Sequence, residues 1–495
     1  MTASEGPVCE TPGWAGDAIF YQIFPDRFAR SDRVTKPSNL EPWDSPPTPH
    51  GFKGGDLLGV LEHLDYLEDL GVNALYFNPI FQSAANHRYH PHDYYQIDPI
   101  LGGNAALRTL LDEAHRRGMR VMLDGVFNHA SRGFFQFNHI VENGPASPYV
   151  DWFYVKQYPL RPYSAPKGQQ GYVAWWDLPA LPKLKVETPA VRDFLWDVAT
   201  YWIDMGVDGW RLDVMTEIDD DEFWREFRRR VKAVDPEAYI VGEIWHDARR
   251  WLMGDQCDAV MNYLLSRACL GFFVGDNLLK AEVARSGYHS IATLDAEEFA
   301  ATIEQILDLY PQPVTEVQFN MLGSHDTPRF KTLARGDDSA YRLSTLFQMT
   351  HPGAPSIYYG DEIGMEGGHD PGCRGAFPWD ERLWDQELRE YVKRCINLRK
   401  AYPALRRGDF SWLFKGQGVV AYSRRLGDQV LVIVINNKAQ PVTVDVPLAS
   451  MEEGARLRDV WQDGDAEVAV SHGTLPGIRV PARSGVVLAR SPLAG

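Results

Sequence analysis

The stretch DGWRLDV, residues 208–214, places two charged side chains inside a run that otherwise reads as a buried β-strand. Side chains two residues apart leave an extended strand on the same face, so Arg211 and Asp213 share one face and the apolar side chains share the other. The pattern predicts either a structural ion pair inside the fold or part of an active site.

Seven other short apolar runs alternate with helical patterns along the chain, as expected for a parallel α/β fold. The expected strands, besides 208–214, are 17–24, 73–80, 119–129, 238–243, 258–262, 318–323 and 355–360. The expected helices include 56–71, with a C-cap at Gly71, then 105–118, and one from Thr188-Pro189 to about Gly206. Eight strand–helix units predict a closed (β/α)8 TIM barrel.

Two parts of the chain do not follow the barrel pattern. The stretch from 130 to 186 is rich in Pro, Gly, Tyr and Trp and is too long for a plain loop, which predicts a loop-rich domain inserted after the third strand. Beyond about Leu405, short strands separated by turn residues predict a C-terminal β-sandwich. The expected domains are therefore the barrel at 14–129 and 187–404, the insert at 130–186, and the sandwich at 405–495.

Composition excludes several classes of function. A formal net charge of −17 over 495 residues argues against nucleic acid or an anionic membrane as a partner. The five cysteines lack any CxxC spacing, which argues against a disulfide framework or a zinc site. The N-terminus lacks the pattern of a signal peptide, and no apolar run approaches the roughly 20 residues that span a bilayer. A cytoplasmic protein is the expectation.

Polar residues gather where the expected strands end, which is where barrel enzymes carry their chemistry. They are Asp124, Asn128, His129, Arg211, Asp213, Glu243, His246, His325, Asp326, Asp361 and Glu362. Carboxylates that share one pocket repel each other, so their pKa values separate and one stays protonated near neutral pH. That arrangement suits glycoside hydrolysis, in which one carboxylate attacks the sugar and one carboxylic acid protonates the leaving oxygen.

Four motifs carry a resemblance to a known family. GVFNH (125–129), DGWRLDV (208–214), GEIWH (242–246) and GSHD (323–326) resemble, in this order, the four signature regions of the α-amylase family of glycoside hydrolases. LPKL (181–184) resembles a signature of the neopullulanase, cyclomaltodextrinase and maltogenic amylase branch. The resemblance covers nearly the whole chain and implies the barrel fold and an α-glucan substrate.

The resemblance also implies roles for individual residues. Asp213 would be the nucleophile, Glu243 the general acid/base, and Asp326 the residue that holds the distorted sugar in the transition state. Arg211 would keep Asp213 ionised, and Tyr94 would stack on the sugar ring at the cleavage site. Further sugar contacts are implied for His92, His129, His246, His325, Asp370 and Arg374.

A calcium site is a weaker implication of the same resemblance. It would use Asp32, Gly54 and Asp56, but Arg30 replaces an expected oxygen ligand, and calcium takes six to eight oxygens. Lys183 in LPKL replaces an acidic residue, and its ammonium could substitute for that cation. The chemistry itself is expected to need no cofactor.

Members of this branch carry an N-terminal β-domain that forms their dimer, whereas this chain begins almost at the first expected strand. A monomer with a more open cleft is therefore expected.

The expected activity is retaining hydrolysis of α-1,4 bonds in maltooligosaccharides and starch. Maltose would be a major product, pullulan and cyclodextrins further substrates, and transglycosylation a side reaction. Three alternatives stay open: a dedicated α-glucanotransferase, a catalytically dead sugar-binding relative, and a metal-dependent barrel hydrolase, whose ligands Asn128-His129 and His325-Asp326 could mimic. Trp175 and Trp176 are expected to pack in the core of the insert and not to form a sugar platform. For Trp245, packing and lining the acceptor side of the site are equally favoured.

Overall fold

The computed structural model describes residues 9–461 and 467–490. Eight strands form one sheet in the order β8-β7-β6-β5-β2-β1-β10-β9, and its pairs are parallel. These strands are β1 (Phe20–Ile23), β2 (Ala74–Phe77), β5 (Arg120–Gly125), β6 (Gly209–Leu212), β7 (Tyr239–Gly242), β8 (Ala259–Val260), β9 (Phe319–Met321) and β10 (Ala354–Tyr358). Just after β8, the amide of Asn262 donates to the carbonyl of Phe319 in β9 at 2.9 Å. The expected barrel and its eight strands are confirmed.

The chain divides into two compact units. The first holds the chain up to Met261 together with Arg374–Trp379. The second holds Asn262–Cys373 together with the chain from Asp380 onward.

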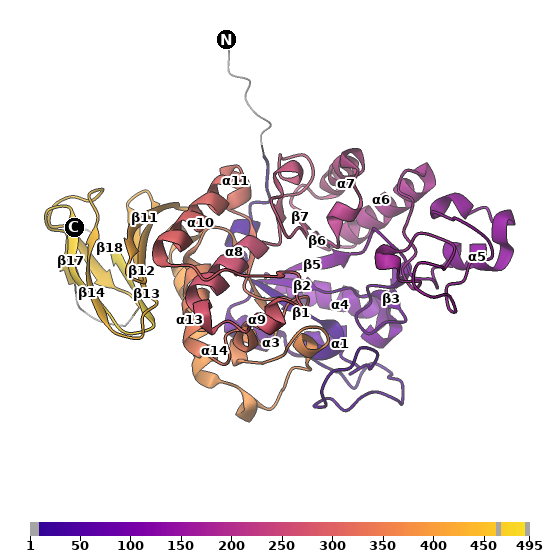
Figure 1. Cartoon of the computed structure of the whole chain (residues 1–495), viewed down its shortest axis with the longest axis horizontal. Helices are drawn as coiled ribbons and strands as arrows, with labels where there is room; N and C mark the ends of the chain where they lie inside the picture. The colour runs from indigo at the N-terminus through magenta and orange to yellow at the C-terminus, as the bar shows by residue number, and fades with distance from the viewer. Residues whose placement is uncertain (1–8, 462–466, 491–495) are drawn as a thin grey trace, which may run out of the picture. The chain divides into compact units, whose positions relative to one another are not determined.

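In the first unit, helices pack around the strands that carry the polar residues. They are α1 (Pro25–Phe28), α2 (Leu57–Glu62), α3 (Leu64–Leu70), α4 (Gly103–Arg116), α5 (Phe135–Asn143), α6 (Pro189–Asp204) and α7 (Asp221–Val234). The helices α6 and α7 lie beside β6 and β7 (Figure 1). Trp210 on β6 is fully buried, and its indole N–H donates to the carbonyl of Ala199 in α6 at 3.2 Å. The apolar face of the opening motif therefore fixes its strand against the helices.

The expected helix 56–71 is broken in two at His63. In an unbroken helix the amide of His63 would bond the carbonyl of Gly59, but the ring Nδ1 of His63 lies 2.7 Å from that carbonyl instead. The amide bonds the carbonyl of Val60, three residues back. The predicted C-cap at Gly71 is confirmed by its left-handed φ of 98°.

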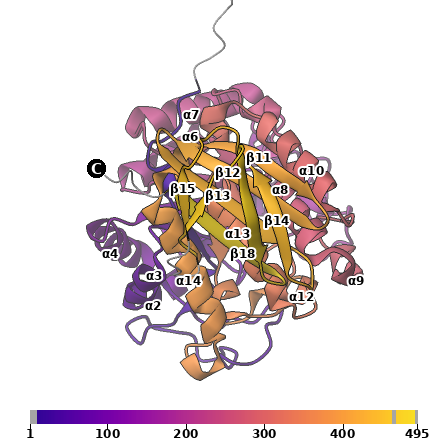
Figure 2. The ribbon, with the colours of Figure 1, turned by 90° about the vertical axis from the view of Figure 1, so that its left-hand side faces the viewer.

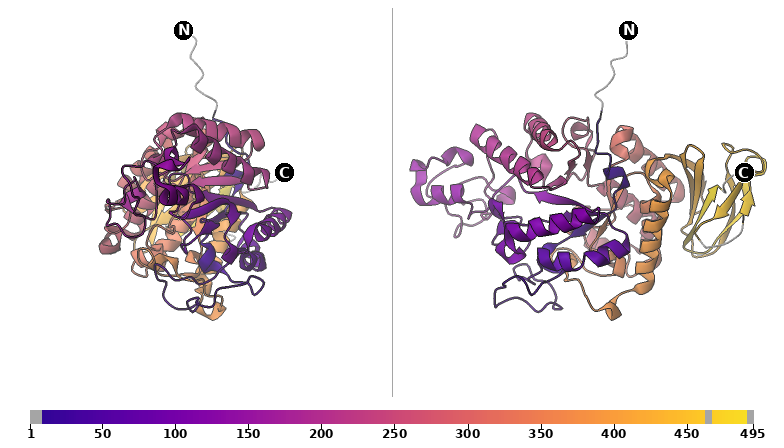
Figure 3. Two further views of the ribbon diagram at one scale, coloured as in Figure 1. Left: turned by 90° about the vertical axis from the view of Figure 1, so that its right-hand side faces the viewer. Right: turned by 180° about the vertical axis from the view of Figure 1, so that it is seen from behind.

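The segment between β5 and α6 contains α5 and otherwise little regular structure. Isolated backbone bridges hold it together, among them His129–Lys183 and Ala174–Pro182. Two views show α5 at one end of its own unit, away from β1, β2 and β5 (Figures 1 and 3). A further hairpin, β3 (Phe81–Ser83) with β4 (Pro91–Ile97), lies between β2 and α4 in the chain.

The second unit ends in two packed antiparallel sheets. Its helices are α8 (Tyr263–Cys269), α9 (Lys280–Val283), α10 (Ala296–Asp308), α11 (Gln312–Thr315), α12 (Phe330–Leu333), α13 (Asp338–Thr350), α14 (Gln386–Ala401) and α15 (Pro403–Arg407). One sheet has the order β11 (Asp409–Gly416), β12 (Val419–Leu426), β13 (Gln429–Asn436), β18 (Ser484–Arg490), β15 (Arg456–Asp459) and β16 (Glu467–Ala469), as Figure 2 shows for its labelled strands. The other pairs β14 (Val442–Pro447) with β17 (Thr474–Val480). Side chains from both sheets share one buried core, including Val432, Val446 and Ile478, which confirms the C-terminal sandwich.

No helix in the described ranges is both long enough and apolar enough to cross a bilayer.

Candidate active site

One buried guanidinium joins three carboxylates from neighbouring strands. Nη1 of Arg211 lies 2.8 Å from Asp124 and 2.9 Å from Asp213, and Nη2 lies 2.9 Å from Glu243. The sheet register pairs Asp124 with Arg211 and Arg211 with Val241, which brings Glu243 alongside two residues later. The motif DGWRLDV therefore holds an ion pair and part of the candidate active site at once, because the paired groups include the candidate catalytic carboxylates.

The charges of this cluster depend on one another. Burial alone would lower the pKa of Arg211, but the carboxylates of Asp124 and Glu243 hold that pKa above its usual value. Burial raises the pKa of Asp124, against the opposing effect of Arg211 and two tyrosine hydroxyls. Those hydroxyls belong to Tyr76 and Tyr89, and each donates to Oδ2 of Asp124 at 2.8 Å. Asp124 therefore anchors the arginine, with both of its oxygens engaged inside the cluster.

Glu243 is held by donors from two sides. Its Oε1 accepts the indole N–H of Trp245 at 3.0 Å, and its Oε2 accepts the amide of Val214 at 2.8 Å. Val214 adopts φ 40° and ψ 45°, a left-handed conformation that is unfavourable for a β-branched residue. The strained turn directly after Asp213 therefore aims a backbone donor at the second carboxylate. Asp213 and Glu243 are only 7% and 8% exposed.

His129 is buried and held as a neutral ring. Burial lowers its pKa to about 3, and Nε2 lies 3.0 Å from the carbonyl of Tyr89. Because a carbonyl only accepts, Nε2 carries the proton. The side-chain amide of Asn128 lies 3.2 Å from Nδ1.

The ring of Tyr94 is not open to a sugar. Tyr94 is fully buried, its ring contacts those of Phe81, Phe134 and Phe194, and its hydroxyl donates to the carbonyl of His129 at 2.9 Å. This placement contradicts the expectation that Tyr94 stacks on the substrate. The half-buried Tyr89, five residues earlier, reaches the cluster instead through Asp124.

The remaining expected sugar contacts of the first unit lie outside the arginine cluster. His92 is half-buried on β4, with its ring against Gly133. His246 is exposed, and its Nδ1 lies 3.0 Å from the carbonyl of Asp247. Arg374 is buried, with its guanidinium over the ring of Phe24.

In the second unit, His325 and Asp326 contact each other. Nε2 of His325 lies 3.1 Å from Oδ2 of Asp326, and the aspartate side chain is 29% exposed whereas the histidine is buried. Asp370 is exposed and precedes a cis proline at Pro371. The pairing of His325 with Asp326 agrees with their expected neighbourhood at the end of one strand.

Comparison with known proteins identifies the family. Residues 22–400 match the catalytic domain of α-amylase, and residues 410–488 match the neopullulanase-like C-terminal domain. The chain belongs to the α-amylase family of glycoside hydrolases. A family relative, the cyclomaltodextrinase of Geobacillus thermopakistaniensis, is 46% identical over 443 residues, which cover 89% of this chain and 72% of that relative.

Two solved structures resemble the chain over almost its whole length. A protein from Thermus thermophilus superposes with a TM-score of 0.92 at 49% identity, covering 97% of this chain and all of that one. The debranching enzyme of Nostoc punctiforme superposes with a TM-score of 0.88 at 47% identity, covering 97% of this chain and 99% of that one.

The residues expected to bind calcium do not fit that ion. Both oxygens of Asp56 are engaged, one by the amide of Gly59 and one by the amide of Ser31 and the ammonium of Lys36, which lies at 2.8 Å. Gly54 donates its amide to Asp26, and the Asp32 side chain is exposed. Within the described residues, no group of three His, Cys, Asp or Glu side chains could hold a metal ion. The ammonium of Lys36 supplies the positive charge beside Asp56.

Lys183 bridges two segments of the first unit. Its ammonium donates to the carbonyl of Glu217 at 2.8 Å and lies 3.7 Å from the carboxylate of the same residue. The residue thus ties the segment after β5 to the loop that follows Asp213.

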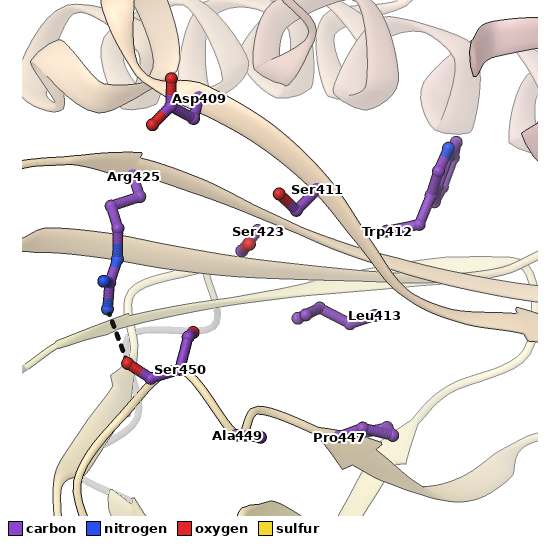
Figure 4. A pocket seen from close by; sticks show the side chains of 9 residues that line it. All are labelled: Asp409, Ser411, Trp412, Leu413, Ser423, Arg425, Pro447, Ala449 and Ser450. Atoms are coloured by element: carbon purple, nitrogen blue, oxygen red, sulfur yellow. Dashed lines mark hydrogen bonds between the residues drawn. The ribbon is translucent and has the colours of Figure 1, made fainter.

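A pocket of about 360 Å³ lies in the C-terminal sandwich, and none of the residues that line it is an expected site residue (Figure 4). Its lining residues are Asp409, Ser411, Trp412, Leu413, Ser423, Arg425, Pro447, Ala449 and Ser450. The ring of Trp412 points toward the helices, in contact with Phe299 of α10, and does not floor the pocket. The pocket therefore lacks an aromatic platform for a sugar.

Proposed function

We propose that this chain is a retaining α-glucan hydrolase that cleaves α-1,4 bonds in maltooligosaccharides and starch. The observation that carries the proposal is the guanidinium of Arg211 shared by Asp213 and Glu243. A retaining mechanism needs two carboxyl groups close together, because one attacks the sugar directly with no water between them. The shared arginine holds both groups as neighbours in a nearly buried site.

The proposed reaction has two steps. The carboxylate of Asp213 attacks the anomeric carbon while Glu243 gives its proton to the leaving glycosidic oxygen, which breaks the glycosidic bond. Glu243 then takes a proton from water, and that water breaks the ester to Asp213 and regenerates both groups. In this scheme Arg211 stabilises the ionised nucleophile, and Asp326 binds hydroxyls of the distorted sugar.

Binding roles are proposed for the remaining residues by the same resemblance. Tyr89 replaces Tyr94 as the ring beside the cleaved sugar, since it is half-buried and bonded to Asp124. His129 and His325 would bind sugar hydroxyls, and His92, His246, Asp370 and Arg374 are assigned to more distant sugar units.

The substrate range is proposed from the names of relatives. These include cyclomaltodextrinase, neopullulanase, maltogenic α-amylase and a debranching enzyme. We propose maltose as a major product, with pullulan and cyclodextrins as further substrates and transglycosylation as a side reaction. A product time course on maltotriose, starch, pullulan and β-cyclodextrin distinguishes these activities from dedicated transfer.

The mechanism is tested by removing each carboxylate. Asp213→Asn and Glu243→Gln should each lower kcat on maltotriose by about 10³-fold or more, because each removes a group that bonds the substrate covalently or transfers its proton. Asp247→Asn removes a half-buried neighbouring carboxylate that pairs with Arg249, and it is the control, with activity near that of the wild type. Proton NMR of the first product should show the α-anomer; a β-anomer, or activity that survives either substitution, would reject the mechanism.

The organisation of the whole protein is also a proposal. We divide it into the barrel (14–129 and 187–404), the insert (130–186) and the C-terminal sandwich (405–495), which is supported by the matched ranges 22–400 and 410–488. We further propose that the protein is a monomer and lies in the cytoplasm. Size-exclusion chromatography with light scattering tests the oligomeric state.

A further inference from the structure

Exposed aromatic side chains are concentrated on the segment between β5 and α6. Five Phe, Tyr or Trp side chains are exposed in the described part of the chain, and four of them lie between residues 130 and 186. They are Phe135, Tyr158, Tyr163 and Trp176, the fifth being Tyr201. Exposed apolar side chains that stand singly are common on protein surfaces, so each of these four rings has to be judged by its own surroundings.

Trp176 differs from the other three because its ring ends a stack that begins in the core. Its ring lies 4.3 Å from that of Trp175 with an angle of 13° between them. The ring of Trp175 lies 5.2 Å from that of His129 at 10°. Three nearly parallel rings therefore lead from buried His129 to Trp176, whose side chain is 68% exposed.

The backbone holds Trp176 outward at a conformational cost. Trp176 and Asp177 have φ of 51° and 55°, a left-handed region that residues with side chains rarely occupy, and here two in succession occupy it. Strain of this kind persists where the surroundings impose it, and it is commonest at binding sites. In the described residues, the buried indole N–H of Trp175 has no hydrogen-bond partner, a second unfavourable feature of the same loop.

The loop that carries Trp176 is anchored to the end of β5. The amide of Ala130 bonds the carbonyl of Pro182, the amide of Arg132 bonds that of Ala180, and His129 forms a bridge with Lys183. The same β5 carries Asp124, which bonds Arg211. The exposed ring is thus fixed to the strand that supports the catalytic cluster.

We propose that Trp176 is a sugar-stacking residue that binds a glucose unit of a longer α-1,4-glucan, beyond the units bound at the cleaved bond. The exposed indole offers a flat apolar face, and a pyranose ring has a matching face of C–H groups. Trp175 and His129 behind it hold the indole at a fixed angle, so little conformational entropy is lost on binding. The inference rests on the proposed α-glucan hydrolysis and adds a determinant of chain-length preference.

Three substitutions separate the ring from the backbone strain. Trp176→Phe keeps a ring and should bind long substrates nearly as the wild type does. Trp176→Gly removes the ring and relieves the left-handed φ, so its thermal midpoint should equal or exceed that of the wild type while long-substrate binding is lost. Phe135→Ala removes an equally exposed ring of the same segment and is the matched control.

The measurements are kcat/KM on maltotriose and maltoheptaose, and calorimetric binding of maltoheptaose to the Glu243→Gln protein with and without each change. We expect Trp176→Gly to lower the maltoheptaose-to-maltotriose ratio of kcat/KM about tenfold and to weaken binding of maltoheptaose by a similar factor. Phe135→Ala should leave both quantities within about twofold.

The outcomes keep this inference apart from the proposed function. Binding that depends on Trp176 in a protein that fails to hydrolyse any α-glucan would reject the hydrolase and support the platform. Normal hydrolysis with an unchanged ratio and unchanged binding in Trp176→Gly would reject the platform and leave the hydrolase. An equal loss in Phe135→Ala, or no binding of maltoheptaose at all, would also reject the platform.

Discussion

At the scale of single residues, the site is organised by one arginine more than by any carboxylate. Arg211 is fully buried and touches Asp124, Asp213 and Glu243 from three adjacent strands. A buried charge needs a partner to offset its lost hydration, and here three carboxylates share one cation. When Glu243 holds the proton for the first step, Asp124 and Asp213 remain beside this one cation, which suits a site in which a positively charged sugar forms in the transition state.

The two tyrosines of the β4 region offer a test at this scale. Tyr89→Phe removes a donor to Asp124 and should lower kcat/KM on maltotriose about tenfold, because the support of Arg211 weakens. Tyr94→Phe removes only the bond to the carbonyl of His129 and should cost about 1 kcal/mol of unfolding free energy with little loss of activity. Urea unfolding and steady-state kinetics measure both. A larger kinetic loss in Tyr94→Phe would show that the bond to the carbonyl of His129 also supports catalysis.

The contrast between these residues shows which contacts of the site can be predicted from the sequence. The alternation in DGWRLDV predicted the pairing of Arg211 with Asp213, since both lie on one strand and period two determines their face. The bonds to Asp124 and Glu243 depend on register between strands, which no local pattern contains. Tyr89 was missed for the same reason.

At the scale of elements, apolar runs predicted all eight barrel strands because each strand is buried on both faces. The break of helix 56–71 was not predictable, since the 3.6-residue period continues through it. It arises from a local competition in which the ring of His63 takes the carbonyl of Gly59. The strained turn at Val214 was also not predictable from the sequence, because a β-branched residue is not expected to adopt a left-handed φ.

Helix α2 provides a prediction in which tertiary contact reverses helix propensity. Alanine usually stabilises a helix by about 1 kcal/mol relative to glycine. A Cβ on Gly59 would lie 2.5 Å from the carbonyl oxygen of Ala29, which belongs to the backbone and has little room to move. We expect Gly59→Ala to lower the unfolding free energy by about 1–3 kcal/mol, as measured by urea denaturation. A stabilised variant would mean that α2 is free to shift away from Ala29.

At the scale of the whole molecule, an acidic chain is held together partly by its own buried cations. The formal net charge is −17, yet two lysines of the long loop between α1 and α2 bind backbone carbonyls. Lys36 binds the carbonyl of Ile100, outside the loop, and Lys53 binds carbonyls within it. Lys53 is fully buried and lies 2.7 Å from the carbonyls of both Pro42 and Ser45. These ammonium groups order the loop by binding oxygen atoms around a positive charge, as a bound metal ion does in other proteins.

This replacement predicts how the protein responds to a chelator. Because Lys36 lies 2.8 Å from Asp56 and donates to the carbonyl of Ile100 at 2.5 Å, removing divalent cations should move the thermal midpoint by less than about 1 °C. Lys36→Met leaves the buried Asp56 carboxylate without that partner and should cost about 3 kcal/mol, whereas Lys415→Met, which breaks an exposed pair with Glu304, should cost less than about 1 kcal/mol. Calorimetry with EDTA and with added calcium measures the first effect, and urea unfolding the second. A midpoint that falls by several degrees in EDTA and recovers with calcium would show that an ion, and not Lys36, neutralises Asp56.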